Sequence, residues 1–131
     1  MSGLKYLLVE DDEIFMYLHE HIIRNIDADA IIVEKRSSVA ALEYLLDLEE
    51  KKEVAPDRIL LDINMPELGG FQLLEKIEHL MKGGLKDTLI YMVSSSLYEQ
   101  DKNRALSYWF VKGFMEKPMT TNHMREIVEG K

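Results

Sequence analysis

The sequence contains no cysteine, which excludes disulfide bonds, thiolate metal sites and thiol-based catalysis. It also lacks any apolar run close to the ~20 residues that a membrane-spanning helix needs. Its N-terminus has none of the basic-then-apolar pattern of a secretory signal. We therefore expect a cytoplasmic protein with no membrane-inserted segment.

Basic residues are scarce relative to acidic ones. Lys and Arg number 16 against 24 Asp and Glu, which gives a net charge of −8. Because affinity for nucleic acid depends on Lys and Arg that neutralise phosphates, direct nucleic-acid binding is not expected. The hydrophobic content of 47% is ordinary for a globular protein. With 131 residues and no repeat, low-complexity tract or linker, the chain is predicted to form a single domain over residues 1–131.

The stretch from Arg58 to Gly70 is central to the interpretation. Apolar residues 59–61 run directly into Asp62, and the chain then breaks at Pro66 and at a glycine pair. A short apolar run between turn signals predicts a strand buried on both faces, with Asp62 at its carboxyl end. A carboxylate at this position either serves a ligand site or caps the next turn, as Asp often does in loops. The stretch alone leaves both interpretations open.

Apolar runs of strand length alternate with patterns of helical spacing along the whole chain. The strands are predicted at residues 6–9, 30–33, 59–61, 89–93 and 113–116. The helices are predicted at residues 13–26, from 38 onwards, at 71–81, at 98–110 and from 121 onwards. Five such alternations predict an α/β fold, a doubly wound five-stranded parallel sheet with helices on both faces.

Three further predictions concern the helices. Thr121 is predicted to cap the last one. The four histidines are expected on the surface, because His19 and His21 cannot share a helix face and the other two stand alone. In helix 13–26, the buried stripe is predicted to consist of Ile14, Leu18 and Ile22.

Polar side chains follow four of the five predicted strands. In an open α/β sheet, the ligand crevice lies beyond the carboxyl ends of the strands. Each of these side chains alone has an ordinary structural explanation as a cap, a turn residue or a solvated lysine. Their joint presence at one edge of the sheet favours a functional pocket instead. The pocket would contain Glu10 and Asp11 after the first strand, Asp62 after the third, Ser94 after the fourth and Lys117 after the fifth.

The chemistry of this set is specific. Two carboxylates a few ångströms apart repel by about 4 kcal/mol at an effective dielectric near 20, so three require a cation or shifted pKa values. Oxygen ligands without His or Cys favour a hard divalent ion such as Mg²⁺. A carboxylate beside Mg²⁺ and the ammonium of Lys117 is a plausible phosphoryl acceptor.

Four motifs stand at the ends of the predicted strands: Val9-Glu10-Asp11-Asp12, Asp62-Ile63-Asn64-Met65-Pro66 with Gly70, Val93-Ser94-Ser95, and Lys117-Pro118. In this order and spacing they resemble the receiver domain of response regulators in two-component signalling. The likeness covers essentially the whole chain and is closest to stand-alone, chemotaxis-type receivers. It implies a flavodoxin-like sheet with strand order 2-1-3-4-5 and five helices.

The resemblance also implies a site. Asp62 would accept a phosphoryl group from a histidine kinase or histidine phosphotransfer protein. Mg²⁺ would be held by Glu10, Asp11, Asp62 and the backbone carbonyl of Asn64. Lys117 would pair with the phosphoryl group, ahead of a cis bond to Pro118.

A switch is implied as well. Ser94 would follow the phosphate, and Phe114 would change rotamer, altering the affinity for an unidentified downstream protein. With no effector domain in this chain, output is expected through such a partner, a homodimer or a phosphate relay. The nearby aromatic residues are predicted to form either core or a docking face next to Phe114; these are Tyr98, Tyr108, Trp109 and Phe110.

Three positions depart from the common family pattern. Glu10 replaces the more usual Asp, which lengthens the arm and allows coordination through water. Ser94 stands where Thr is frequent, and Phe114 stands where Tyr is common and so lacks the phenol hydroxyl. Asn64 and Ser96 occupy positions that tune the lifetime of the phosphoryl group in the family.

Two alternatives stay open beside the receiver. A phosphatase of the haloacid-dehalogenase type also uses an Asp nucleophile after a strand, but it needs a second Asp two residues later, where Asn64 stands. The second alternative is a receiver-like scaffold that is never phosphorylated. For the receiver itself, no enzyme activity is expected beyond catalysis of its own phosphorylation and dephosphorylation.

Overall fold

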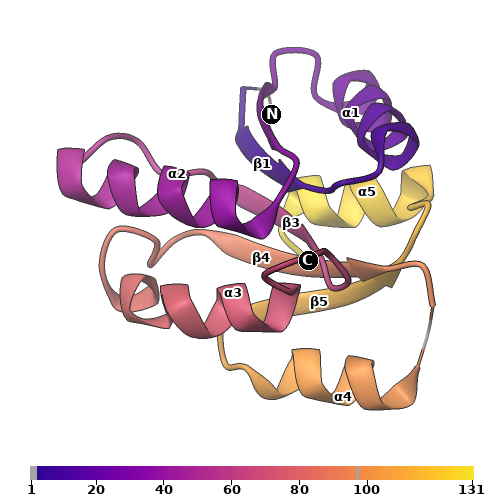
Figure 1. Cartoon of the computed structure of the whole chain (residues 1–131). Coiled ribbons are helices and arrows are strands. Elements are labelled where there is room, and N and C mark those ends of the chain that lie inside the picture. Colours follow the sequence, from indigo (N-terminus) through magenta and orange to yellow (C-terminus); the bar gives the residue numbers. More distant parts are fainter. Residues whose placement is uncertain (1–2, 97) are drawn as a thin grey trace.

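The computed structural model describes residues 3–96 and 98–131, which form five strands that alternate with five α-helices (Figure 1). The strands are β1 (Lys5–Val9), β2 (Ile31–Lys35), β3 (Arg58–Asp62), β4 (Leu89–Ser94) and β5 (Val111–Glu116). The helices are α1 (Glu13–Ile26), α2 (Ser38–Lys51), α3 (Gly70–Ile77), α4 (Glu99–Ser107) and α5 (Thr121–Glu129), with a 3-10 turn (Glu78–Lys82) after α3. The predicted α/β class is confirmed.

All strand pairs are parallel, and the order in the sheet is β2-β1-β3-β4-β5, as predicted. Alternate residues of a strand point to opposite faces, so each face has its own core. Leu7 and Val9 of β1 pack in the core beneath α2, α3 and α4, whereas Tyr6 and Leu8 pack in the core beneath α1 and α5. Figure 1 shows the two groups of helices on opposite sides of the sheet.

Side-chain caps fix where the helices begin. Asp12 accepts hydrogen bonds from the backbone N–H groups of Ile14 and Phe15 and so starts α1 directly after the acidic motif. The last helix is capped by Thr120, whose hydroxyl accepts from the His123 N–H at 3.0 Å. The predicted cap, Thr121, is instead the first helical residue, because the neighbouring hydroxyl already satisfies the free N–H.

The predicted stripe of α1 is wrong for two of its three residues, Ile14 and Leu18, whereas Ile22 is partly buried and packs against the core. Ile14 is 69% exposed and Leu18 lies at the surface, whereas the buried row is Met16, His19 and Ile23. Both rows have helical spacing, and which row faces the sheet depends on the direction in which the chain leaves β1. The real row was missed because it contains a histidine, which the hydrophobic pattern counts as polar.

The predicted helix over 98–110 is too long. α4 ends at Ser107, and the next three residues form the turn that leads into β5. Phe110 is buried and Tyr108 stacks on Phe71 with ring centroids 6.2 Å apart, so these rings belong to the core. Trp109 and Tyr98 are exposed, and their docking role stays a prediction. Within the described residues, no helix is long and apolar enough to cross a membrane.

Candidate functional site

The acidic residues of the first and third strands meet at one edge of the sheet. β1 and β3 are neighbours, with Val9 opposite Leu61, so the residues that follow these two lie side by side. Glu10, Asp11 and Asp62 each offer a carboxylate oxygen within 4.8 Å of the others. Glu10 is 3% exposed and Asp62 is 2% exposed, while Asp11 faces solvent. The cluster is therefore buried on its inner side and open on its outer side.

The loop after Asp62 is held by a close backbone approach. The N–H of Gly70, the first residue of α3, donates to the Ile63 carbonyl at 2.8 Å. A Cβ at residue 70 would lie only 2.6 Å from the Asp62 carbonyl oxygen, so only glycine fits there without displacing the strand end. The Asn64 N–H in turn donates to Asp62 Oδ1 at 3.3 Å. These contacts fix the direction of the Asp62 carboxylate.

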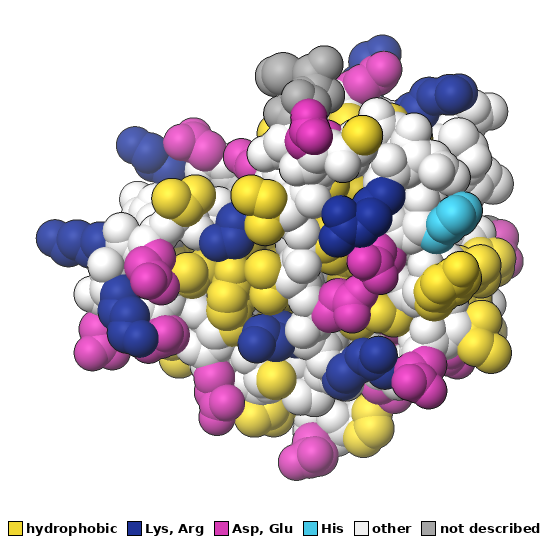
Figure 2. Space-filling model, turned by 90° about the horizontal axis from the view of Figure 1, so that it is seen from above, with side chains coloured by type: hydrophobic (Ala, Val, Ile, Leu, Met, Phe, Trp, Pro, Cys, Tyr) yellow, Lys and Arg dark blue, Asp and Glu magenta, His cyan; other side chains and the backbone are white. Residues whose placement is uncertain are grey.

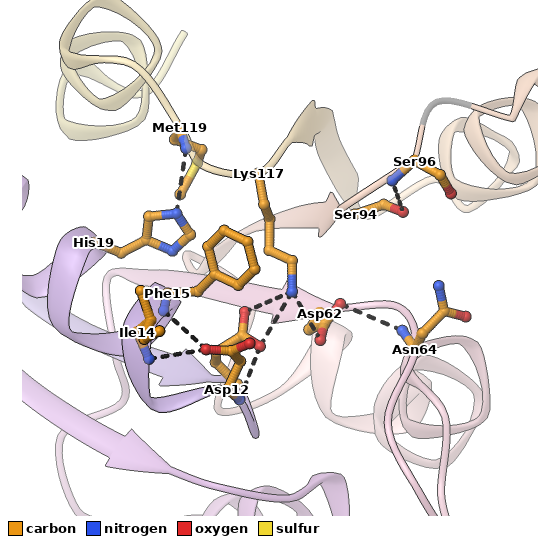
Figure 3. A network of polar contacts seen from close by, with 11 residues as sticks. Asp12, Ile14, Phe15, His19, Asp62, Asn64, Ser94, Ser96, Lys117 and Met119 are labelled. Atoms are coloured by element: carbon orange, nitrogen blue, oxygen red, sulfur yellow. Dashed lines mark hydrogen bonds and ion pairs between the residues drawn. The ribbon is translucent and has the colours of Figure 1, made fainter.

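Lys117 reaches the acidic cluster from the far edge of the sheet. Its N–H donates to the Ser94 carbonyl at 2.8 Å, and the following bond to Pro118 is cis, as predicted. The ammonium Nζ lies 2.9 Å from Glu10 Oε1 and 3.1 Å from Asp62 Oδ2. Figure 3 shows the Lys117 side chain reaching towards Asp62. With only 8% of Lys117 exposed, this is a buried ion triplet and not a surface pair.

Ser94 and Phe114, the two predicted switch residues, are placed differently. Ser94 is fully buried, and its hydroxyl accepts from the Ser96 N–H at 3.2 Å. It lies on the same side of Asp62 as Asn64 in Figure 3, without a hydrogen bond to either among those found in the described residues. Phe114 packs against the core on β5 and is not part of the acidic pocket.

Burial and neighbouring charges shift the pKa values of Glu10 and Lys117. Burial raises the pKa of Glu10 to about 7; the Asp62 carboxylate adds to the shift, and the hydrogen bond from Lys117 opposes it. Burial alone would lower the pKa of Lys117, but its hydrogen bond to Glu10 and the charges of both carboxylates outweigh burial and raise it. Lys117 thus stays an ammonium beside a site with excess negative charge.

The donor set fits a hard divalent cation. The three carboxylates supply oxygen ligands alone, and the exposed position of Asp11 leaves room for water, which Mg²⁺ typically keeps in its shell. Lys117 neutralises part of the cluster without supplying a ligand, since an ammonium has no lone pair. A cation and Lys117 side by side would present two positive centres to an anionic group such as phosphoryl.

Residues 6–129 match the family described as the response regulator receiver domain. This chain belongs to that family. The receiver is similar to the "Probable methanogenesis regulatory protein FilR2" of Methanothrix harundinacea, with 27% identity over 94% of this chain and 77% of that protein. It is also similar to a protein-glutamate methylesterase/protein-glutamine glutaminase of Methanospirillum hungatei, with 31% identity. That match covers 92% of this chain and 33% of the methylesterase.

A solved structure of the same family shares the fold of this chain. A two-component response regulator from Cytophaga hutchinsonii superimposes with a TM-score of 0.89 at 27% identity, covering 99% of this chain and 97% of that one. The flavodoxin-like receiver fold predicted from the motifs is thus confirmed. Receiver domains are phosphorylated by histidine kinases or phosphotransfer proteins, and the relatives include a hybrid signal transduction histidine kinase of Dictyostelium discoideum, of which this receiver spans 7%.

His19 is the residue near the site that sequence reasoning misplaced. It was expected at the surface, but it is 3% exposed, and its Nε2 accepts a hydrogen bond from the Met119 N–H at 3.2 Å. Residues 119 and 19 are far apart in sequence, so no local pattern reveals this pairing. The sequence signal that could have indicated the burial of His19 is its helical spacing with the apolar residues Met16 and Ile23.

The burial of His19 predicts a pH-dependent stability. Burial lowers the pKa of His19 to about 4, and the positive charge of Lys117 adds to the shift. The unfolded chain, with a His pKa near 6.5, binds the proton more readily, so stability falls as pH falls from about 6.5 towards 4. When the pH is lowered from 7 to 5, the unfolding free energy of the wild type should fall by about 2 kcal/mol more than that of His19→Gln. Urea denaturation of both proteins at the two pH values measures this difference. Parallel curves for the two proteins would contradict this.

Proposed function

We propose that this receiver is a phosphorylation-controlled binding module in which Asp62 accepts a phosphoryl group from a histidine kinase or histidine phosphotransfer protein. The observation that carries the proposal is the Lys117 Nζ–Asp62 Oδ2 contact of 3.1 Å within a three-carboxylate cluster. The reaction would require Mg²⁺, held by Glu10, Asp11, Asp62 and the Asn64 carbonyl. We further propose that residues 1–131 act as one receiver unit and that it works in the cytoplasm.

A carboxylate oxygen of Asp62 attacks phosphorus, the new O–P bond forms, and the bond to the donor's histidine nitrogen breaks, leaving neutral imidazole after protonation. Lys117 Nζ, already 3.1 Å from Asp62, pairs with the phosphoryl oxygens as charge develops on them. Bound Mg²⁺ would supply the second positive charge. In dephosphorylation, water attacks phosphorus, the bond between the Asp62 oxygen and phosphorus breaks, and inorganic phosphate leaves with the water proton, which regenerates the Asp62 carboxylate.

The donor would approach over the start of α1. This helix follows the acidic motif directly, and it carries exposed apolar side chains where a soluble surface would usually be polar; they are Ile14, Tyr17 and Leu18. Figure 2, which looks at this side of the molecule, shows hydrophobic side chains between charged ones. Such a surface next to Asp11 suits a helical phosphotransfer partner.

The output would use the opposite flank of the site. Ser94 would turn its hydroxyl to the phosphoryl group and carry its loop along, which would free space for Phe114 to change rotamer. A groove of about 430 Å³ lies at this flank. The groove is lined by both apolar and charged side chains, which supports recognition of a protein partner or a second copy of this chain. The lining residues are Glu99, Lys102, Phe114, Met115, Glu116 and His123. Couplings of about 1–3 kcal/mol suffice for such a switch.

Incubation with Mg²⁺ and acetyl phosphate tests the proposal. The intact mass should rise by one phosphoryl group per chain, and hydroxylamine should remove it, as expected of an acyl phosphate. Chelation of the metal with EDTA should reduce the adduct below detection, because the three carboxylates then repel the phosphodonor. Sustained turnover of many phosphate esters would favour the phosphatase, and absence of both an adduct and Mg²⁺ binding would favour the unphosphorylated scaffold.

A further inference from the structure

The segment after β5 lies against the inner face of α1. Two of its residues, Lys117 and Met119, contact α1 side chains before Thr120 caps α5. Lys117 itself has a long, flexible side chain that can adopt many rotamers. Its ammonium nevertheless has to lie between two carboxylates, so something has to fix the chain from which it extends.

One side of the segment is fixed from the sheet. The Lys117 N–H donates to the Ser94 carbonyl at 2.8 Å. Pro118 has no N–H to donate, so the next backbone donor along the chain is Met119. This N–H donates to His19 Nε2 at 3.2 Å, in the buried interior between α1 and α5. The hydrogen bond therefore fixes the other side of the segment to α1.

The same face of α1 also supports the lysine side chain. Phe15 lies one turn before His19, and the two rings stack with centroids 6.1 Å apart. Lys117 Nζ lies 4.5 Å from the centre of the Phe15 ring, within the range of a cation–π contact. Figure 3 shows His19, Phe15 and the Lys117 ammonium in succession, with Asp62 beyond.

We propose that His19, together with Phe15, is a positioning residue for Lys117: the imidazole holds the Met119 amide, and the ring of Phe15 supports the ammonium beside Asp62. This inference rests on the proposed function, since it concerns the lysine beside the proposed phosphoacceptor. Among the hydrogen bonds and ring contacts of the described residues, His19 reaches Met119 and Phe15 and none of the three clustered carboxylates, so its effect on phosphorylation has to pass through Lys117. Displacement of a reacting group by an ångström can cost roughly a hundredfold in rate.

Three variants of α1 separate this role from simple packing. His19→Leu removes the acceptor and fills the same buried position with an apolar side chain. His19→Gln keeps an acceptor of similar reach. His21→Leu is the matched control, because His21 is exposed on the same helix and stacks only on Tyr17 among the described aromatic residues. The measurement is the rate of Asp62 phosphorylation by acetyl phosphate at saturating Mg²⁺, with the Mg²⁺ affinity determined separately by calorimetry.

His19→Leu should lower the phosphorylation rate by about tenfold or more, while the Mg²⁺ dissociation constant changes less than about twofold. His19→Gln should restore most of the rate, and His21→Leu should match the wild type. In a Lys117→Ala background, His19→Leu should cause no further loss, because residues that act through one group are non-additive.

Other outcomes would overturn the inference. A folded His19→Leu protein phosphorylated at the wild-type rate, or an equal loss in the Lys117→Ala background, would reduce His19 to a packing residue. If His19→Leu does not fold, Phe15→Leu decides: it removes the ring 4.5 Å from Nζ and keeps the acceptor. An unchanged rate in that variant overturns the proposal. A wild type that forms no adduct at Asp62 would instead refute the proposed function.

Discussion

Asp62→Asn is expected to abolish the phosphoryl adduct completely while leaving the fold intact. The amide has nearly the same shape as the carboxylate and can still accept the Asn64 N–H that Asp62 Oδ1 accepts at 3.3 Å. It cannot act as the nucleophile, and it removes one of three clustered carboxylates. Mass spectrometry after incubation with Mg²⁺ and acetyl phosphate should show unmodified protein, and Mg²⁺ affinity should fall by about tenfold.

The variant has a matched control in Asp87→Asn. Asp87 is an exposed aspartate just before β4, at the edge of the sheet opposite the acidic cluster. Its replacement removes the same charge and should leave the adduct stoichiometric. Phosphorylation of the Asp62→Asn protein to the wild-type level would show that another carboxylate or a histidine is the acceptor, and the assignment of Asp62 would be wrong.

The sheet was predictable because its signal is local. A parallel strand covered on both faces needs a continuous apolar run, and each of the five runs in the sequence became a strand, with ends shifted by one or two residues. Helix faces were less predictable. α1 offers two apolar rows, and only packing against the sheet selects the row with Met16 and Ile23 over the row with Ile14.

The site was predictable for a related reason. Parallel strands bring their carboxyl ends to one edge, so Glu10 and Asp62 had to be neighbours once β1 and β3 were. The direct pairing of Lys117 with both carboxylates could not be deduced, because it depends on the conformation of a long side chain. Nor could the His19–Met119 hydrogen bond, which joins residues 100 positions apart.

Lys117→Ala is expected to impair both stability and phosphorylation. The wild-type ammonium lies 2.9 Å from Glu10 and 3.1 Å from Asp62, and all three groups are buried. Without it two buried carboxylates face each other unpaired, which typically costs about 3–5 kcal/mol. Protonation of Glu10 would offset part of this cost at neutral pH, so the deficit in urea denaturation should grow as pH rises above about 7.

Phosphorylation of the same variant should be slower by about a hundredfold or more at saturating Mg²⁺, because a preorganised positive group beside the transferring phosphoryl is lost. Lys112→Ala is the control: Lys112 is exposed on β5, the strand that leads to Lys117, and no ion pair holds it within the described residues. Its stability should stay within about 0.5 kcal/mol of the wild type. If Lys117→Ala is phosphorylated as fast as Lys112→Ala, the ammonium only neutralises the resting carboxylates. The transfer then depends on the cation alone, because no other positive group described in the structure touches Asp62.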